Sequence, residues 1–269
     1  MANSLVAITG ASSGIGAVFA RKLAADYDLL LIARRKDRLE ELAAELHAAR
    51  GTHVEVLQAD LCVSHDLEKV ADRLAGDPKL AILINNAGFG TKGRFWEASL
   101  ESQTQMHQLH VMAAMRLTHA ALCNMVPRDS GAVINVASVA SFVRSQGSVS
   151  YGATKAWMTA FTEALHLELK GMGSHVLVQA LCPGFTYSEF HDTMAVSREA
   201  MAGRQLWMRA EDVVDASLEG LRRGKLFVIP GWRYRVLVSL LTKLPSSLRV
   251  ALESKGGRAR LEAKLEGPQ

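Results

Sequence analysis

Short apolar runs alternate with longer amphipathic stretches along this chain of 269 residues. The apolar runs are rich in Leu, Ile and Val and predict β-strands, at residues 5–8, 29–33, 54–57, 80–84, 132–137, 176–181 and 226–229. The stretches between them predict helices, the first ending near residue 25 and the others spanning residues 36–50, 64–74 with Ser64 as N-cap, 100–125 and 150–170. This alternation predicts an α/β fold with a parallel sheet covered on both faces.

A hydrophobic content of 49% over 269 residues suits one α/β domain with a sizeable core. We expect that domain over residues 1–230, followed by a helical, basic extension over residues 231–269. Cys62, Cys123 and Cys182 lack the spacing of a disulfide framework or a metal site, so we expect reduced thiols and no bound metal. The N-terminus shows no export signal, and no run of about 18 apolar residues is present. A cytoplasmic location is therefore expected.

Positive charge is concentrated at the C-terminal end of the chain. Residues 221–269 carry 11 Lys or Arg against 3 Glu, a net charge of +8, whereas the whole chain carries only +4. The basic excess therefore belongs to the tail. We expect no nucleic-acid partner.

The basic tail includes a predicted helix over residues 232–244. Its apolar arc is wider than a surface helix normally shows, and it contains Tyr234, Val236, Leu237, Val238, Leu240, Leu241 and Leu244. A helix of this length reaches only about 20 Å, too short to cross a bilayer, and Pro245 interrupts its continuation. Packing over a pocket or against a second subunit is the favoured interpretation, with a homo-dimer or homo-tetramer expected. Peripheral contact with an anionic membrane surface and a simple hydrophobic cap are the alternatives.

A glycine-rich turn joins the first predicted strand to the first helix and reads Thr9-Gly10-Ala11-Ser12-Ser13-Gly14-Ile15-Gly16. Glycines let a backbone approach a phosphate closely, and a helix start supplies unpaired amides at a positive dipole end. The spacing differs from the common G-x-G-x-x-G fingerprint, and many such turns need glycine for geometry alone. The turn therefore indicates a dinucleotide site only together with other features.

The second predicted strand ends at Arg34-Arg35, with no acidic residue to bind a ribose 2′-hydroxyl. Arginine suits a 2′-phosphate through its charge and its forked geometry. The alternative is a solvated pair at a helix start.

The residues that carry chemistry lie between Ser138 and Lys155. Tyr151 and Lys155 are four residues apart, so a helix places the ammonium and the phenol on one face. A neighbouring cation lowers the pKa of a phenol and makes it usable for proton transfer. Ser138 follows an apolar strand and should lie at the carboxyl edge of the sheet, where ligands of parallel sheets bind. Alone, the Tyr-x-x-x-Lys spacing is also typical of an ordinary surface pair.

Together these features resemble the classical short-chain dehydrogenase/reductase family over residues 5 to about 230. The matching positions occur in the family's order and are Thr9-Gly10 to Gly16, Asp60, Asn85-Asn86-Ala87-Gly88, Ser138, Tyr151, Lys155 and Pro183-Gly184. The resemblance implies a doubly wound Rossmann sheet of about seven strands, NAD or NADP as cofactor, and hydride transfer between a carbonyl and an alcohol.

The resemblance also implies residue roles. Tyr151 would be the general acid/base, Lys155 would lower its pKa and hold the nicotinamide ribose, and Ser138 would donate to the developing oxyanion. The implied cofactor site consists of Gly10, Ser12, Ser13, Gly14, Ile15, Gly16, Arg34, Arg35, Asp60, Leu61, Asn86, Ala87, Gly88, Tyr151, Lys155, Pro183, Gly184 and Thr186.

One position departs from the family's pattern. His110 stands where the fourth catalytic residue, an asparagine, is usual. Three interpretations are open: a tolerated replacement, an altered pH dependence, or a weakened enzyme.

We therefore expect an NADP-dependent oxidoreductase, with a catalytically weak dinucleotide-binding sensor or scaffold as the alternative. The family's variable substrate loop corresponds to residues 185–208, which contain Phe185, Tyr187, Phe190, Met194, Met201, Leu206, Trp207 and Met208. Adaptable methionines and aromatic rings suit an apolar substrate, such as a lipid, a steroid or an aromatic ketone. The alternative is that these side chains only pack the loop.

Overall fold

The computed structural model describes residues 4–91, 93–187 and 206–254. Seven parallel strands form one sheet in the order β3-β2-β1-β4-β5-β6-β7, which confirms the predicted Rossmann-type fold. The strands are β1 (Leu5–Thr9), β2 (Asp28–Ala33), β3 (Val54–Gln58), β4 (Leu80–Asn85), β5 (Ala132–Val136), β6 (Leu177–Leu181) and β7 (Phe227–Val228).

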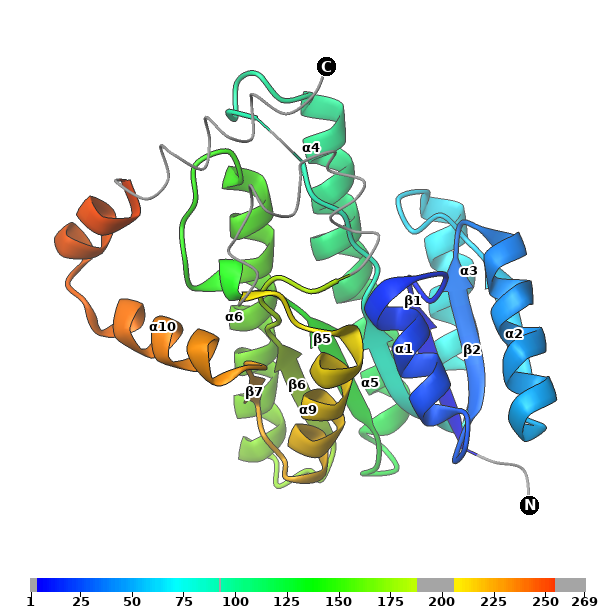
Figure 1. Ribbon diagram of the computed structural model, residues 1–269. Helices are drawn as coiled ribbons and strands as arrows, with labels where there is room; N and C mark the ends of the chain where they lie inside the picture. Colours follow the sequence, from blue (N-terminus) through cyan, green and yellow to red (C-terminus); the bar gives the residue numbers. More distant parts are fainter. Residues whose placement is uncertain (1–3, 92, 188–205, 255–269) are drawn as a thin grey trace.

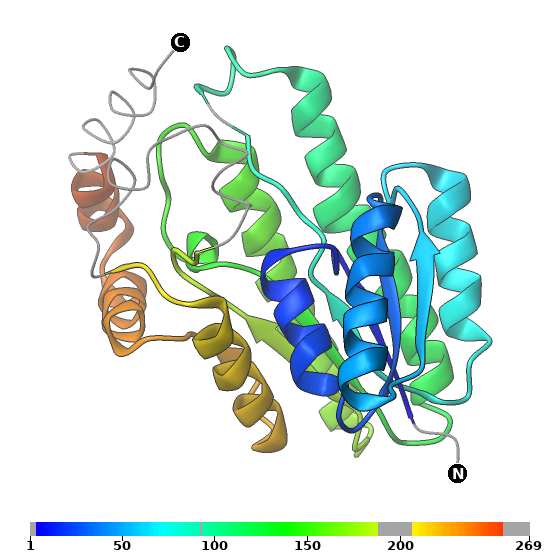
Figure 2. The same ribbon diagram turned by 45° about the vertical axis from the view of Figure 1, so that its right-hand side comes forward.

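Helices cover both faces of the sheet (Figures 1 and 2). They are α1 (Gly14–Leu23), α2 (Lys36–Arg50), α3 (Ser64–Ala75), α4 (Leu100–His107), α5 (Ala114–Met125), α6 (Val149–Gly171), α9 (Ala210–Arg222) and α10 (Trp232–Lys243). Successive side chains of a strand point to opposite faces. Thus Val6 and Ile8 pack in the core layer of α1, α2 and α9, whereas Leu5 and Ala7 pack in the layer of α3, α5 and α6.

Two predicted helix features differ in the structure. The predicted helix over residues 100–125 contains a π-helical turn, Gln108–Ala113, between α4 and α5. Ser64 is the first helical residue of α3 rather than its N-cap, and Val63 occupies the cap position without a side-chain cap bond. The preceding turn is held instead by the Asp66 carboxylate, which accepts from the backbone N–H of Asp60 at 2.8 Å.

The order of the sheet brings the predicted site residues together. β1 pairs with β2 on one side and with β4 on the other, so the chain reverses its direction of progress across the sheet next to β1. A crevice for ligands forms at such a switch point, outside the carboxyl ends of the strands. In Figure 1 these ends point toward the top.

Helix α10 divides its apolar residues between two sides. Tyr234 and Val238 are buried, whereas Val236, Leu237 and Leu240 are 49%, 41% and 61% exposed. The wide apolar arc predicted from the sequence is therefore only partly covered within one chain. Within residues 4–91, 93–187 and 206–254, no helix is long and apolar enough to cross a membrane.

Candidate functional site

The glycine-rich turn after β1 is bound to the segment that follows β4. The Thr9 hydroxyl accepts from the backbone N–H of Asn86 at 2.9 Å and of Ala87 at 3.0 Å. The Asn86 amide donates to the carbonyls of Thr9 and Gly10 at 2.9 and 3.2 Å. A Cβ on Gly16 would lie 2.5 Å from the Asn86 amide nitrogen, and Gly10 has a positive φ of 66°. Gly10 and Gly16 thus permit contacts within the protein, in addition to the phosphate approach inferred from the sequence.

The residues at the start of α1 fit a dinucleotide. Ser13 occupies the N-cap position without a side-chain cap bond, and the first turn of α1 holds no acidic residue. The first amides of a helix in this condition form a binding site for a phosphate group. Gly14 in the same turn has a positive φ of 55°.

Two arginines flank this helix start. The Arg35 guanidinium donates to the hydroxyls of Ser12 and Ser13 at 3.0 and 2.9 Å, so it lies over the glycine-rich turn, although the residue itself is exposed. Arg34 is 74% exposed and lies 4.0 Å from the Asp60 carboxylate. Asp60 in turn accepts from the backbone N–H of Cys62 at 3.0 Å. The structure thus brings the two arginines that follow β2 next to Ser12, Ser13 and Asp60, which the sequence analysis assigned to the same candidate site.

Ser138, Tyr151 and Lys155 converge at the carboxyl end of β5. The Ser138 hydroxyl accepts from the backbone N–H of Ala140 at 3.1 Å and donates to the Pro183 carbonyl at 3.5 Å. The Lys155 ammonium donates to the Val136 carbonyl at 2.8 Å and lies 5.9 Å from the centroid of the Tyr151 ring. The polar groups expected from the sequence therefore share one location.

The pKa of Tyr151 differs from the expectation. Burial raises the pKa of the phenol above its usual value, although a hydrogen bond with Ser138 lowers it in part. Burial also lowers the pKa of Lys155 to about 8. The sequence argument considered only the neighbouring cation, whereas loss of solvent is the larger influence on both groups.

His110 lies in the π-helical turn and is fully buried. Its Nε2 accepts from the backbone N–H of Phe89 at 3.2 Å, so Nδ1 carries the proton and donates to the Thr154 hydroxyl at 3.0 Å. That hydroxyl donates to the Tyr151 carbonyl at 2.9 Å. Burial and the charge of Lys155 hold the pKa of His110 well below its usual value. A Cβ on Gly88 would lie 2.7 Å from His110 Nε2, so the imidazole and the glycine fit only as a pair.

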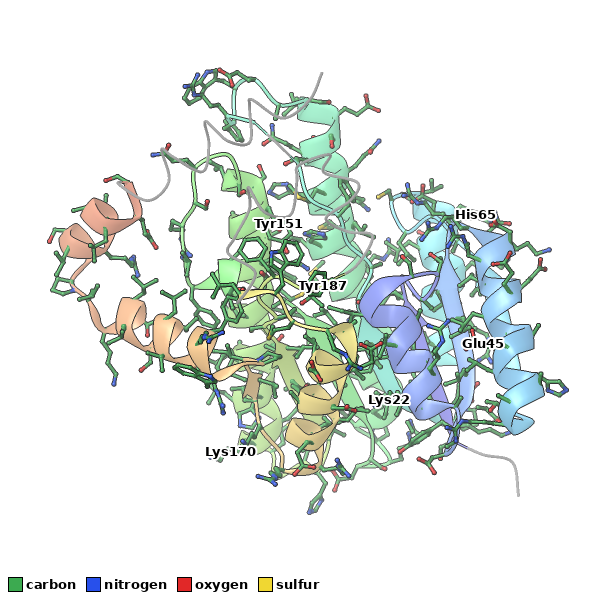
Figure 3. All side chains as sticks on the ribbon, in the orientation of Figure 1. Lys22, Glu45, His65, Tyr151, Lys170 and Tyr187 are labelled. Carbon is green, nitrogen blue, oxygen red and sulfur yellow. The ribbon has the colours of Figure 1, made fainter. Side chains whose placement is uncertain are left out.

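The segment after β6 completes the site. The Pro183 carbonyl accepts from the backbone N–H of Val139 at 3.0 Å, and the Thr186 hydroxyl donates to the Gly184 carbonyl at 3.0 Å. The rings of Phe185 and Tyr187 both pack against Trp207. Figure 3 shows Tyr187 on the same side of the molecule as Tyr151. Phe190, Met194 and Met201, which the sequence assigns to the same loop, lie outside the described residues.

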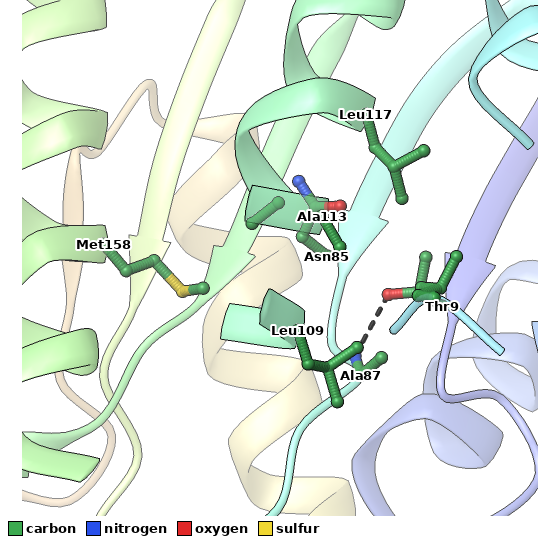
Figure 4. Close-up of a pocket in the computed structure, with 9 residues that line it drawn as sticks. Thr9, Asn85, Ala87, Leu109, Ala113, Leu117 and Met158 are labelled. Carbon is green, nitrogen blue, oxygen red and sulfur yellow. Dashed lines mark hydrogen bonds between the residues drawn. The ribbon is translucent and has the colours of Figure 1, made fainter. Parts of the chain in front are cut away.

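A small cavity lies behind the site, between β4 and the π-helical turn (Figure 4). Its volume of about 10 Å³ suits one water molecule, so a substrate cannot enter it. Asn85, whose buried Oδ1 has no hydrogen-bond partner among the residues that the structure describes, belongs to its lining. The other lining residues are Thr9, Leu61, Ala87, Leu109, Ala113, Ala114, Leu117 and Met158.

Three residues of this arrangement were missed by the sequence reasoning. Thr9 was noted only as part of a motif, and Thr154 lies between Tyr151 and Lys155 without a pattern of its own. Tyr234 was assigned only to an apolar arc, yet its hydroxyl accepts from the backbone N–H of Phe185 at 3.0 Å. Only the polar tip of a buried tyrosine could have pointed to such a contact.

Comparison with known proteins agrees with this geometry. A family model for short chain dehydrogenases matches residues 4–198. The chain belongs to the short-chain dehydrogenase family. A structure of a short-chain dehydrogenase from Sphingobium yanoikuyae in complex with NADPH is 36% identical, covers 91% of this chain and 97% of its own, and superposes with a TM-score of 0.81. This protein is accordingly an NAD(P)-dependent oxidoreductase.

Two further structures show the range of the relatives. A bulky-bulky ketone specific alcohol dehydrogenase from Comamonas testosteroni is 32% identical, with 92% of this chain and 97% of that chain covered and a TM-score of 0.77. A short-chain dehydrogenase/reductase from Burkholderia phymatum in complex with NAD is 26% identical, with coverages of 90% and 94% and a TM-score of 0.79. Both NADPH and NAD thus occur among the relatives.

Replacing His110 with Asn tests whether the imidazole is neutral in the fold. Because its folded pKa lies well below 6.5, the unfolded chain takes up a proton first as the pH falls below 6.5. The stability linked to neutral His110 is complete above that pH and decreases below it. Between pH 7.5 and 5.5, the parent should lose about 1.4 kcal/mol more unfolding free energy than His110→Asn. Urea denaturation at the two pH values measures this difference. His65→Asn, at an exposed residue of α3, is the control for the loss of a histidine. Equal losses in the parent and in His110→Asn would contradict a neutral His110.

Proposed function

We propose that this enzyme interconverts a carbonyl and an alcohol on an apolar substrate, with NADP as its preferred cofactor. The observation that carries the proposal is the convergence of Ser138, Tyr151 and Lys155 at the carboxyl end of β5, at the same edge of the sheet as a helix start suited to a dinucleotide. Each group sits where its chemistry is needed, on an element that the sheet holds rigid.

The bound cofactor would supply or accept the hydride. Burial keeps the Tyr151 phenol protonated at neutral pH, so Tyr151 can donate a proton to a carbonyl oxygen that gains negative charge. The Ser138 hydroxyl would stabilise the same oxygen by a hydrogen bond. The Lys155 ammonium, held on the Val136 carbonyl, would favour the phenolate after transfer and bind the nicotinamide ribose.

The aromatic group beside the site favours an apolar substrate. Trp207 lies between Phe185 and Tyr187, with centroid distances of 5.4 and 5.1 Å, and Tyr187 is 40% exposed. The relative from Comamonas testosteroni carries a name that refers to bulky ketones. Both observations support a lipid, steroid or aromatic ketone over a small polar carbonyl.

The rival proposal is a catalytically weak dinucleotide-binding sensor or scaffold. His110 is the residue that suggests it, because the family uses asparagine at that position. The imidazole, however, makes contacts that tie Thr154 to Phe89 and leave Ser138, Tyr151 and Lys155 together. Active catalysis is therefore the better proposal.

Replacing Tyr151 with Phe tests the catalytic proposal. The variant keeps the ring but loses the transferable proton, so turnover of NADPH with a panel of ketones and aldehydes should fall by about 100-fold or more. Cofactor binding, followed by NADPH fluorescence, should persist. Tyr187→Phe removes a hydroxyl from the same side of the molecule and serves as the control. Near-normal turnover by Tyr151→Phe would refute the assignment, and a parent that turns over none of the panel would favour the sensor.

Cofactor preference depends on Arg34 and Arg35. Arg35 lies over Ser12 and Ser13, and exposed Arg34 lies near Asp60, so we propose that both contact the 2′-phosphate of NADP. A charge-assisted bond is worth about 1.5 to 3 kcal/mol, or at least about tenfold in affinity.

Calorimetry with Arg34→Gln and Arg35→Gln measures these contributions separately. Each replacement should weaken NADPH binding by about tenfold or more and leave NADH binding nearly unchanged. Lys36→Gln, one residue further along, is the control. Equal affinity of the parent for NADH and NADPH would contradict the proposed preference.

We also propose that the outward side of α10 contacts a second copy of the chain in a homo-oligomer. Trp232, Val236 and Leu240 are 63%, 49% and 61% exposed on that side, so it presents apolar side chains that a second copy could cover. We propose a cytoplasmic location as well.

Sedimentation velocity tests the proposed oligomer. The parent should sediment as a dimer or tetramer, and the double variant Val236→Glu with Leu240→Glu should dissociate, because charged side chains cannot be buried in an apolar interface. Val63→Glu, at an exposed apolar residue outside α10, is the control. A monomeric parent that sediments with anionic liposomes at low salt would support the membrane alternative instead.

A further inference from the structure

The inward side of α10 contacts the part of the chain that flanks the expected substrate loop. Tyr234 is only 4% exposed, and its ring packs against the backbone of Gly184. A Cβ on Gly184 would overlap that ring, with approaches of 2.1 to 2.5 Å to three ring carbons. The glycine of the Pro183-Gly184 motif therefore leaves room for this tyrosine.

The hydroxyl of Tyr234 joins two segments that are far apart in sequence. It accepts from the backbone N–H of Phe185 at 3.0 Å and donates to the carbonyl of Leu206 at 2.7 Å. Phe185 and Leu206 stand on either side of residues 188–205. One phenol oxygen thus satisfies a donor on one segment and an acceptor on the other.

Short-range pairing reinforces this junction. Thr186 and Met208 form an isolated parallel bridge, in which Met208 N–H donates to the Phe185 carbonyl at 2.9 Å and Tyr187 N–H donates to the Met208 carbonyl at 3.0 Å. A single bridge of this kind is weak without further support. The two bonds of Tyr234 supply that support from a separate element.

The junction is continuous with the reacting groups. Gly184 is preceded by Pro183, whose carbonyl accepts from the Ser138 hydroxyl and from the backbone N–H of Val139. Ser138, Tyr151 and Lys155 themselves come from the end of β5 and from α6. A change at Tyr234 should therefore move the substrate-side backbone and leave those three groups in place.

We propose that Tyr234 is a positioning residue for substrate binding, which acts by fixing the backbone at residues 184–187 and 206–208. This proposal rests on the proposed function of the site. A second contact also links the C-terminal part of the described chain to the site. The Glu253 carboxylate accepts from the backbone N–H of Arg144, which lies between Ser138 and Tyr151 in the sequence. The C-terminal segment thus belongs to the substrate side of the enzyme.

The variant Tyr234→Phe tests the hydroxyl, because it keeps the ring on Gly184 and removes both bonds. We expect KM for the carbonyl substrate to rise about tenfold, the effect of losing one or two buried hydrogen bonds, with kcat changed by less than about threefold. The dissociation constant for NADPH should stay within about twofold, since the ring still supports the Pro183-Gly184 motif. Ser239→Ala, which also removes a hydroxyl from α10 but at an exposed residue outside the proposed interface, is the matched control.

Hydrogen exchange provides a readout that does not depend on turnover. Amides in peptides covering residues 184–187 and 206–210 should exchange faster in Tyr234→Phe than in the parent, while peptides of β1, β4 and β5 should be unchanged. Faster local exchange in the variant, combined with a parent that shows no measurable turnover, would still support the role of Tyr234 in fixing the backbone. It would refute the proposed reaction instead. Unchanged local exchange, or a lower melting temperature with unchanged KM, would overturn the role of Tyr234.

Discussion

The parallel direction of the strands is the constraint on which the site depends. Because all seven strands run the same way, their carboxyl ends lie along one edge of the sheet. Thr9 ends β1, Asn85 ends β4, and Ser138 follows β5, so groups far apart in sequence meet there. The sheet is covered on both faces, and this rigid edge can therefore hold polar groups in fixed positions.

Burial at this edge moves three titratable groups toward their neutral forms. It raises the pKa of Tyr151, lowers that of Lys155 to about 8, and holds that of His110 far below its usual value. A neutral phenol is a proton donor, and an ammonium with a pKa near 8 can change its charge close to neutral pH. His110, in contrast, must stay neutral because its Nε2 accepts from Phe89. The same loss of solvent thus suits Tyr151 to the proposed proton transfer and keeps His110 in its structural hydrogen bonds.

Local patterns predicted the parts of the molecule that local sequence controls. The apolar runs predicted the strands. Because a helix follows almost every strand, the alternation also predicted that the strands are parallel. The π-helical turn was missed because it shifts the register of apolar positions by a single residue within an otherwise helical stretch. The predicted lowering of the Tyr151 pKa was wrong. Burial raises this pKa, and burial depends on residues that only the fold brings together. Arg34 and Arg35 were marked by their charge, but which of them lies over Ser12 and Ser13 depends on side-chain directions that no spacing records.

The proposed cofactor half and the proposed substrate half of the site are held by different kinds of contact. This explains why sequence motifs pointed to the first more directly than to the second. The cofactor half is built from neighbouring strands. Thr9 ends β1 and Asn86 follows β4, and their hydrogen bonds hold together the turns that follow these two strands. The substrate half depends on contacts across long stretches of chain, such as Phe185 with Tyr234. A few hydrogen bonds at a surface segment give lower local stability than a buried strand pair. On the proposed role of Tyr234, substitutions in α10 would alter the substrate half while the sheet preserves the cofactor half, so specificity would change without loss of the shared chemistry.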